Sequence, residues 1–121
     1  MIELGNSRIR AMENSDLKKV QSWRNNPYFR QFFREYRELS MEHKSSWFSK
    51  IVCDNRFEMF MIEDSATGET IGVAGLTYID WVNRHADVHF YIAKNQAWID
   101  KKYAPDAIKI ILEYGFNTIN I

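Results

Sequence analysis

Three strand-like segments between positions 56 and 93 constrain the fold of this 121-residue chain more than any other feature. RFEMFMIED (56–64) has the period of an extended strand, and the turn DSATGE leads into the next strand, which begins with TIGVAGLTYID (70–80). A third, ADVHFYIA (86–93), follows after a short connection and alternates in the same way. Strands joined by such short turns pair antiparallel, so the sequence predicts a sheet of consecutive hairpins.

Helical patterns flank these strands. A short first strand (7–12) leads to Asn, Ser and Asp, which can cap a helix beginning in DLKKVQSWRNN (16–26), and Ser40 can cap a second helix (41–52). A last helix has Pro105 in its first turn. The order predicts an α+β domain with a mainly antiparallel, mixed sheet of about four strands covered by helices. We expect a single domain over residues 1–121.

Two of these helices have apolar residues at helical spacing, which indicates the faces they bury. The face expected in the second helix consists of Met41, Lys44, Phe48, Ile51 and Val52. The face expected in the last helix consists of Ala104, Ala107, Ile108, Ile111, Leu112 and Gly115.

Composition bears on which ligands and which cellular location we expect. Sixteen basic and sixteen acidic side chains cancel, so no global field attracts nucleic acid or an anionic membrane. A single cysteine, Cys53, rules out an internal disulfide and makes a cytoplasmic location the default expectation; we expect this thiol to be buried and inert. We expect neither a signal peptide nor a membrane anchor, because no apolar run approaches ~18 residues. The histidines and the cysteine show no ligand spacing, so we expect no metal.

Two segments allow more than one interpretation. NPYFRQFFREYREL (26–39) interleaves arginines with aromatic residues, which suits either base stacking or packed aromatics beside a ligand pocket. The neutral overall charge favours the second interpretation. TYIDWVNRH (77–85) can line a groove or simply form a hairpin turn, and the sequence leaves both open.

In the order of its expected strands and helices, and in short sequence motifs within them, the chain resembles the GNAT superfamily of N-acetyltransferases. The resemblance is greatest to the branch that includes the Rim-type ribosomal-protein acetyltransferases and related sugar-amine acetyltransferases. The resemblance spans nearly the whole chain, and no single motif is decisive for it. The matching segments are SRIRAMENSDLKKVQSWRNNP, HKSSWF, ETIGVAGLTYIDWVNRHADVHFYI and YAPDAIKIILEYGF.

The resemblance implies transfer of an acetyl group from acetyl-CoA to an amine, without a metal. In the family the pantetheine of the cofactor lies along the end of the fourth strand, and the pyrophosphate sits on the N-terminus of the next helix. The residues implied to bind cofactor are Tyr91, Ile92, Ala93, Lys101, Lys102, Tyr103 and Ala104. Lys102 occupies the position of a family glycine that lets backbone approach the phosphate, so this chain departs from the family pattern there.

Other site residues follow from the same comparison. Asp87 and His89 are the candidate general bases, with His85 just before them, although a histidine on a half-buried strand face is also explained by packing. The residues implied for the acceptor side are Trp23, Arg24, Tyr78, Asp80 and Trp81. The acceptor amine itself is not identified by the sequence.

Family members continue after the last helix with a fifth strand, whereas this sequence ends at NTINI. The resemblance therefore implies either a truncated member of the family or a cofactor cleft that a second copy or another protein completes, and an uncovered sheet edge predicts a homo-oligomer. The alternative is a non-catalytic remnant of the fold that acts as a binding or oligomerisation module. Binding of acetyl-CoA distinguishes the two hypotheses.

Overall fold

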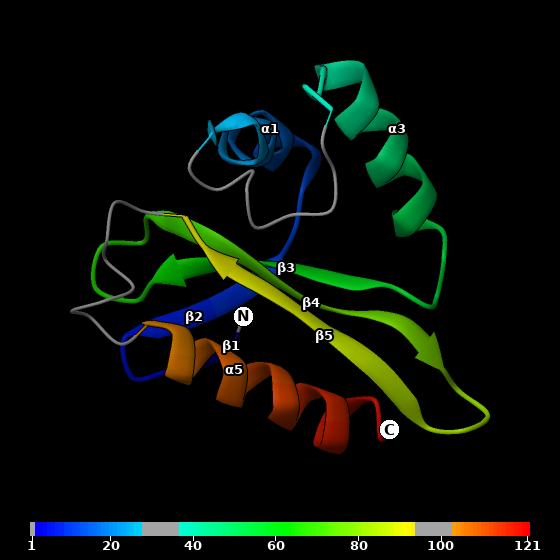
Figure 1. Cartoon of the computed structure of the whole chain (residues 1–121). Coiled ribbons are helices and arrows are strands. Elements are labelled where there is room, and N and C mark those ends of the chain that lie inside the picture. The colour runs from blue at the N-terminus through cyan, green and yellow to red at the C-terminus, as the bar shows by residue number, and fades with distance from the viewer. Residues whose placement is uncertain (1, 28–36, 94–102) are drawn as a thin grey trace.

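The computed structural model describes residues 2–27, 37–93 and 103–121 (Figure 1). Its centre is an antiparallel five-stranded sheet in the order β1-β2-β3-β4-β5. The strands are β1 (Ile2–Leu4), β2 (Ser7–Ala11), β3 (Glu58–Asp64), β4 (Thr70–Asp80) and β5 (His85–Ile92). The expected α+β class is confirmed. The expected count of about four strands was one short, because the three residues of β1 pair with β2 through a tight turn and are too few to show a period.

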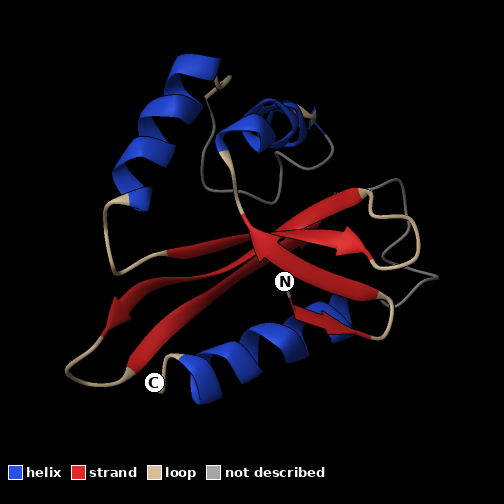
Figure 2. Ribbon diagram, turned by 180° about the vertical axis from the view of Figure 1, so that it is seen from behind, coloured by secondary structure: helices blue, strands red, loops and turns tan. Residues whose placement is uncertain are grey.

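Helices cover both faces of this sheet. They are η1 (Asn14–Asp16), α1 (Leu17–Asn25), α3 (Met41–Val52), α5 (Tyr103–Glu113) and the π-helical turn η2 (Tyr114–Thr118). Figures 1 and 2 show α1 and α3 on one face and α5 on the other. None of the helices in the described ranges is long and apolar enough to cross a membrane.

The side chains of β3, β4 and β5 alternate between two apolar clusters, one on each face of the sheet. On one face, Met61 and Val73 pack with Leu17 and Val20 of α1. On the other, isoleucines of the strands pack against the buried face of α5. That face consists of Tyr103, Ala107, Ile110 and Ile111.

The buried face of α5 differs from the expected one. Leu112 is 39% exposed, Ile108 is half-buried, and Ile110 is buried instead. Apolar residues at four of the five positions from 108 to 112 surround most of the helix, so their spacing did not fix which side meets the sheet.

The ends of α3 also differ from expectation. Lys44 and Ile51 are buried as expected, but Met41 is 39% exposed and Val52 is 66% exposed. Cys53 is exposed, so the prediction of a buried thiol was wrong. The reason is local: Cys53 is the C-cap residue of α3, where the chain leaves the helix and turns back toward the sheet.

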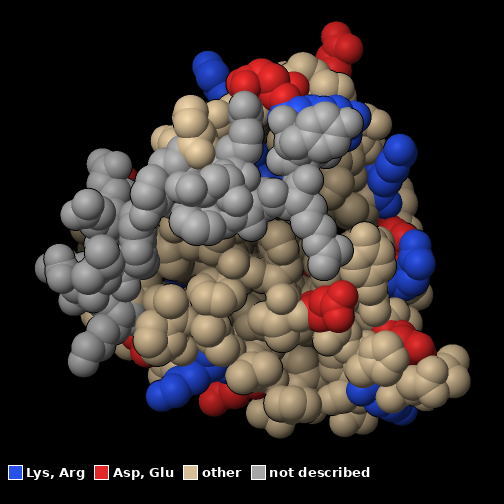
Figure 3. Space-filling view, in the orientation of Figure 1, with Lys and Arg blue, Asp and Glu red and all other residues tan. Residues whose placement is uncertain are grey.

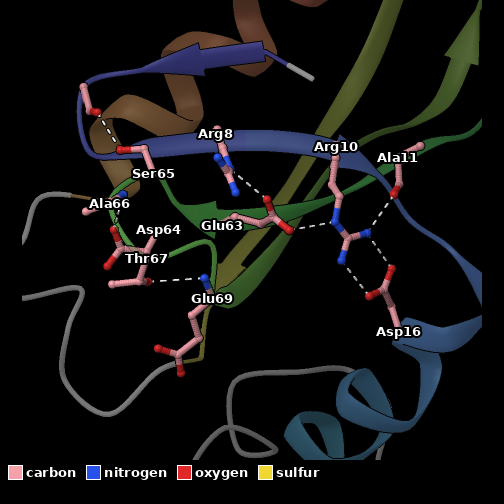
Figure 4. A network of polar contacts seen from close by, with 11 residues as sticks. Arg8, Arg10, Ala11, Asp16, Glu63, Asp64, Ser65, Ala66, Thr67 and Glu69 are labelled. Atoms are coloured by element: carbon pink, nitrogen blue, oxygen red, sulfur yellow. Dashed lines mark hydrogen bonds and ion pairs between the residues drawn. The ribbon is translucent and has the colours of Figure 1, made fainter.

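A network of ion pairs joins β2, β3 and η1 (Figure 4). Arg10 donates from Nε to Glu63 Oε2 (2.7 Å) and from both terminal nitrogens to the carboxylate of Asp16 (2.8 Å each). Arg8 donates to the other oxygen of Glu63 (2.8 Å). Burial is the largest single effect and opposes ionisation of both carboxyl groups, but the hydrogen bonds and charges of their partners, Arg10 foremost, together outweigh it and hold the pKa values of Asp16 and Glu63 below their usual range. The network therefore fixes the entry to α1.

Candidate functional site

A cavity of about 520 Å³ opens between α1, α3 and the sheet face formed by β3, β4 and β5. Its walls combine aromatic rings with positively charged side chains. Among the described lining residues, the aromatic ones are Trp47, Phe57, Tyr78 and Tyr91, and the cationic ones are Arg24, Arg37, Lys44 and Lys50. A concave site with apolar walls and a few polar groups is the usual form of a small-molecule site.

Strand β5 contributes His89 and Tyr91 to the cavity, because alternate side chains of a strand point to the same face. The Tyr91 ring makes edge contacts with Trp23 (6.3 Å between centroids) and with His89 (5.9 Å). Burial raises the pKa of Tyr91 well above its ordinary value, outweighing the opposite effect of Arg24. The phenol therefore keeps its proton at neutral pH.

His89 lies in an environment that disfavours its charged form. Burial lowers its pKa most, and the positive charges of Arg24 and Lys44 lower it further. The imidazole is therefore neutral near pH 7 and has a nitrogen able to accept a proton. Asp87, the other candidate base, is exposed and is not one of the residues lining the cavity.

Helix α3 brings Lys44 and Trp47 to the cavity. A reciprocal cap fixes the helix start: His43 N–H donates to Ser40 Oγ (3.1 Å), and Ser40 N–H donates to His43 Nδ1 (3.0 Å). One turn later Lys44 is only 6% exposed, with its ammonium 3.9 Å from the centroid of the Trp47 ring. This cation–π contact accommodates a buried charge at the cavity wall.

A β-bulge in β4 brings Tyr78 to the rim of the cavity. The register of β4 with β5 shifts between Thr77 and Asp80, and Tyr78 has a φ of 51°. The centroids of the Tyr78 and Phe57 rings lie 5.1 Å apart in an edge-to-face arrangement. A positive φ is unfavourable for a bulky residue and is found where the surrounding structure imposes it, often at functional sites.

The outer edge of β5 lies beside this cavity, and no described strand pairs with it. Ala93 N–H donates to Ile71 C=O (2.7 Å), so in the antiparallel ladder the backbone groups of Ala93 and Tyr91 face β4. Those of Ile92 consequently face the open edge. Gly72 on β4 permits this close pairing, because a Cβ there would collide with the carbonyl oxygen of Tyr91.

The other residues predicted for the acceptor side lie apart from the cavity or beside it. Asp80 accepts backbone hydrogen bonds within the β4–β5 turn, from Val82 (3.1 Å) and Asn83 (2.9 Å). Trp81 donates from its indole to Asn55 C=O (3.1 Å). Asp80 therefore stabilises the turn, and Trp81 ties the turn to the connection between α3 and β3. Trp23 packs against the apolar cluster next to the cavity.

The residues predicted for the cofactor pyrophosphate are only partly described. Lys101 and Lys102 lie outside the described residues. Tyr103 is 5% exposed, donates its hydroxyl hydrogen to Asp64 (2.7 Å) and accepts at its carbonyl from Ser7 (2.9 Å). Its side chain therefore serves the core, whereas Ala104 is half-buried at the start of α5.

Sequence reasoning missed several residues of the cavity wall, notably His43, Trp47 and Lys50, whereas Arg37 belongs to the segment 26–39 that was expected beside a ligand pocket. One signal was available: a lysine, Lys44, stands within the apolar spacing of its helix, and a charge on a buried face marks a special site. Within the described ranges, no group of three or more His, Cys, Asp or Glu residues is arranged to hold a metal ion.

Comparisons with known proteins agree with this architecture. The acetyltransferase (GNAT) domain family matches residues 7–121. Spermidine N(1)-acetyltransferase of Vibrio cholerae serotype O1 is 27% identical over 113 residues, covering 93% of this chain and 64% of the relative. The Escherichia coli enzyme of the same name is 30% identical over 115 residues, covering 94% of this chain and 59% of the relative. The chain thus spans about three fifths of the length of these relatives.

Solved structures of spermidine N-acetyltransferases are also similar to this chain. The crystal structure of spermidine N-acetyltransferase from Vibrio cholerae in complex with CoA and spermine superposes with a TM-score of 0.84 at 26% identity, covering 96% of this chain and 67% of that one. A dodecameric structure of the enzyme in an intermediate state has a TM-score of 0.78 at 26% identity, covering 96% and 66%. Since the family match covers nearly the whole sequence, the chain belongs to the acetyltransferase (GNAT) domain family.

Proposed function

We propose that this domain transfers an acetyl group from acetyl-CoA to an amine, with the acceptor in the cavity and the cofactor arm along the edge of β5. One observation supports the proposal most: the single strand β5 borders both the cavity and the open edge of the sheet. His89 and Tyr91 point into the cavity, while Ile92 presents its N–H and C=O to the open edge. Cofactor and acceptor would therefore meet beside the same strand.

The described residues fit the cofactor in two respects. The backbone of Ile92 offers one donor and one acceptor to an amide-bearing chain laid along the edge, as an added strand would receive them. The first described turn of α5, with Tyr103 and Ala104, lies at the positive end of the helix dipole, which favours an anion such as the pyrophosphate. When bound, acetyl-CoA supplies a thioester carbonyl as the electrophile.

His89 is the base that the cavity supports best. An ammonium acceptor must lose a proton before its nitrogen can attack, and a neutral imidazole inside the cavity can take that proton directly or through water. The lowered pKa of His89 keeps it unprotonated at neutral pH. Asp87 remains the second candidate, acting from the exposed part of the same strand face.

Calorimetric titration with acetyl-CoA, followed by an assay of thiol release with a panel of amines, tests the proposal. We expect His89→Gln to lower kcat about 100-fold at pH 7 while leaving acetyl-CoA binding unchanged. Asp87→Asn is the matched comparison on the same strand. A larger loss in Asp87→Asn than in His89→Gln would move the base to Asp87.

The same titration decides between an enzyme and a non-catalytic remnant of the fold. We expect binding of acetyl-CoA, and no binding at millimolar cofactor would favour the remnant. We also propose that the chain self-associates, since unpaired strand edges recruit partners and a relative is described as dodecameric. Light scattering measures this, and a monomeric mass at assay concentrations would contradict it.

A further inference from the structure

Strand β4 changes the face to which its side chains point just before it ends. Leu76 and Ile79 are 3% and 2% exposed, and both belong to the apolar cluster on the α5 side of the sheet. In a regular strand, side chains three residues apart point to opposite faces. The register shift between Thr77 and Asp80 supplies the extra residue that returns Ile79 to the core. Two consecutive residues, Thr77 and Tyr78, therefore line the cavity.

Core packing fixes this bulge but does not require a tyrosine in it. Ile79 N–H donates to Arg56 C=O (2.9 Å), which holds the chain just after the bulge. Tyr78 has a φ of 51°, a region in which glycine or asparagine is less strained than a bulky residue. Its side chain is 63% exposed, so burial offsets little of the strain. The ring is thus held at the cavity rim despite an unfavourable backbone conformation, and such strain is concentrated at ligand-binding positions.

A second ring completes the rim. The Phe57 and Tyr78 rings meet edge to face at 65°, and the Arg56 guanidinium lies 5.7 Å from the Phe57 centroid. An ion pair with Asp54 (2.8 Å) holds Arg56 in place. We call Phe57 and Tyr78 the aromatic rim. Acidic and basic side chains are interspersed over the described surface in Figure 3, so the rings are a better guide to the ligand than charge is.

We propose, building on the proposed acetyl transfer, that the acceptor is an arylalkylamine, which is a primary amine joined to an aromatic ring by a short carbon chain. Its ring would pack against Tyr78 and Phe57 in the edge-to-face or offset arrangements that aromatic pairs prefer. Its amine would lie near His89, which lines the same cavity from β5.

The register of β4 and β5 sets the length of such an acceptor. Gly75 lies opposite His89, and Tyr78 follows Gly75 by three residues. At the rise of a strand this separation is roughly 10 Å, and the bulge shortens it. Because the centroids of packed rings lie about 5 Å apart, a chain of about two to four carbons joins the amine to a ring in contact with Tyr78.

The reaction at the amine is the one already proposed. The free amine nitrogen forms a bond to the acetyl carbon and loses a proton to His89. The carbon–sulfur bond breaks, and its electron pair leaves on the sulfur of CoA. The aromatic rim takes no part in these bond changes and acts on the choice of acceptor alone.

Binding of four amines in the absence of cofactor tests the ring preference: 2-phenylethylamine, 2-cyclohexylethylamine, propylamine and putrescine. The NMR signals of the Trp47 indole and the His89 imidazole report binding, because both side chains line the cavity. We expect 2-phenylethylamine to bind about tenfold more tightly than propylamine, and about threefold more tightly than the cyclohexyl compound, which has a similar size but no aromatic ring. Equal affinities for the two ring compounds, or tighter binding of propylamine or putrescine, would overturn the proposal.

Variants at and beside the bulge locate the preference. Tyr78→Gly removes the ring and suits a φ of 51°, so it is expected to fold and to lose most of the preference for 2-phenylethylamine over propylamine. Tyr78→Asn is a second variant without the ring that tolerates this φ, whereas Tyr78→Phe keeps the ring and should keep the preference. Val82→Gly is the matched control, because Val82 is 89% exposed in the adjoining turn and is not one of the described residues that line the cavity. Urea unfolding identifies the folded variants, and an unchanged preference in folded Tyr78→Gly or Tyr78→Asn would overturn the assignment.

Turnover with acetyl-CoA separates this inference from the proposed function. Preferential acetylation of 2-phenylethylamine supports both. Binding of this amine without acetylation supports the ligand class and counts against acetyl transfer. Preferential acetylation of propylamine or putrescine overturns the inference and supports the proposed function. If 2-phenylethylamine does not bind, the inference is overturned and the acetyl-CoA titration alone decides the proposed function.

Discussion

Replacing Arg10 with methionine tests how the fold positions the first helix of the cavity. Among the described residues, only Arg10 connects Glu63 of β3 with Asp16 at the start of α1. Methionine keeps much of the side-chain volume and removes the charge. Glu63 retains Arg8, whereas Asp16 keeps the backbone N–H of Glu13 (2.8 Å) and loses its ionic partner.

The expected cost follows from burial. Removing one partner of a buried ion pair costs about 3–5 kcal/mol, since the other charge stays buried without compensation. The Asp16 and Glu63 side chains are 10% and 8% exposed, but that of Arg10 is 24% exposed, so solvent screens part of the effect. We therefore expect a loss of about 2–3 kcal/mol in the free energy of unfolding. For a domain of this size that lowers Tm by about 6–15 °C.

Urea unfolding followed by tryptophan fluorescence measures this loss. The control is Arg56→Met, because Arg56 makes an ion pair of equal length with Asp54 (2.8 Å) at the surface and should leave stability unchanged. Equal losses in the two variants, or a loss below about 0.5 kcal/mol in Arg10→Met, would refute the argument from burial.

The pH dependence gives a second test of the network. The folded pKa values of Asp16 and Glu63 lie below their unfolded values, so the stability they contribute is present above those values and is lost as the pH falls. The difference between wild type and Arg10→Met should therefore narrow below about pH 5. A difference that stays constant down to about pH 3 would contradict the assigned ionic cause.

Three further predictions concern the strand that borders the cavity and the core beneath it. Gly72→Ala should loosen the pairing of β4 with β5 and weaken acetyl-CoA binding, measured by calorimetry; unchanged affinity would contradict the close contact. Tyr103→Phe should cost about 1–2 kcal/mol in urea unfolding by removing the hydrogen bond to the buried carboxylate of Asp64, and equal stability would show that this bond contributes nothing net. NMR titration should place the pKa of His89 below 6.5, and Lys44→Met should raise it; a pKa above 6.5 in the wild type would refute the positive environment. Because this folded pKa lies below the unfolded one, His89 should reduce stability as the pH falls below about 6.5.

The central strands could be predicted from sequence because their signals were local. The segment 70–80 coincides with β4, since the turn DSATGE precedes this strand-like run and the short connection WVNRH follows it. Likewise, a capping serine marked the start of α3 at Met41. The face of α5 could not be predicted, because which isoleucine is buried depends on how the helix lies on the sheet.

The site was harder to predict because it depends on contacts between distant segments. Arg24, Tyr78, His89 and Tyr91 were predicted through the family resemblance and line the cavity. The bulge at Tyr78 depends on the register of two strands, which no single segment encodes. Lys44 and Lys50 were treated only as positions of a helix. Their place in the cavity wall depends on how α3 packs against α1 and the sheet, which the sequence of the helix does not specify.

The alternation of β5 sets a rule for how this hairpin can vary. A slip of one residue against β4 would turn Phe90 and Ile92 into the cavity and bury His89 and Tyr91 against α5. A slip of two residues would restore the faces but move each side chain about 6.8 Å along the sheet. Length changes between β4 and β5 must therefore be absorbed within the turn. Natural variants or engineered loops that shift the register should lose ligand binding even where the domain still folds.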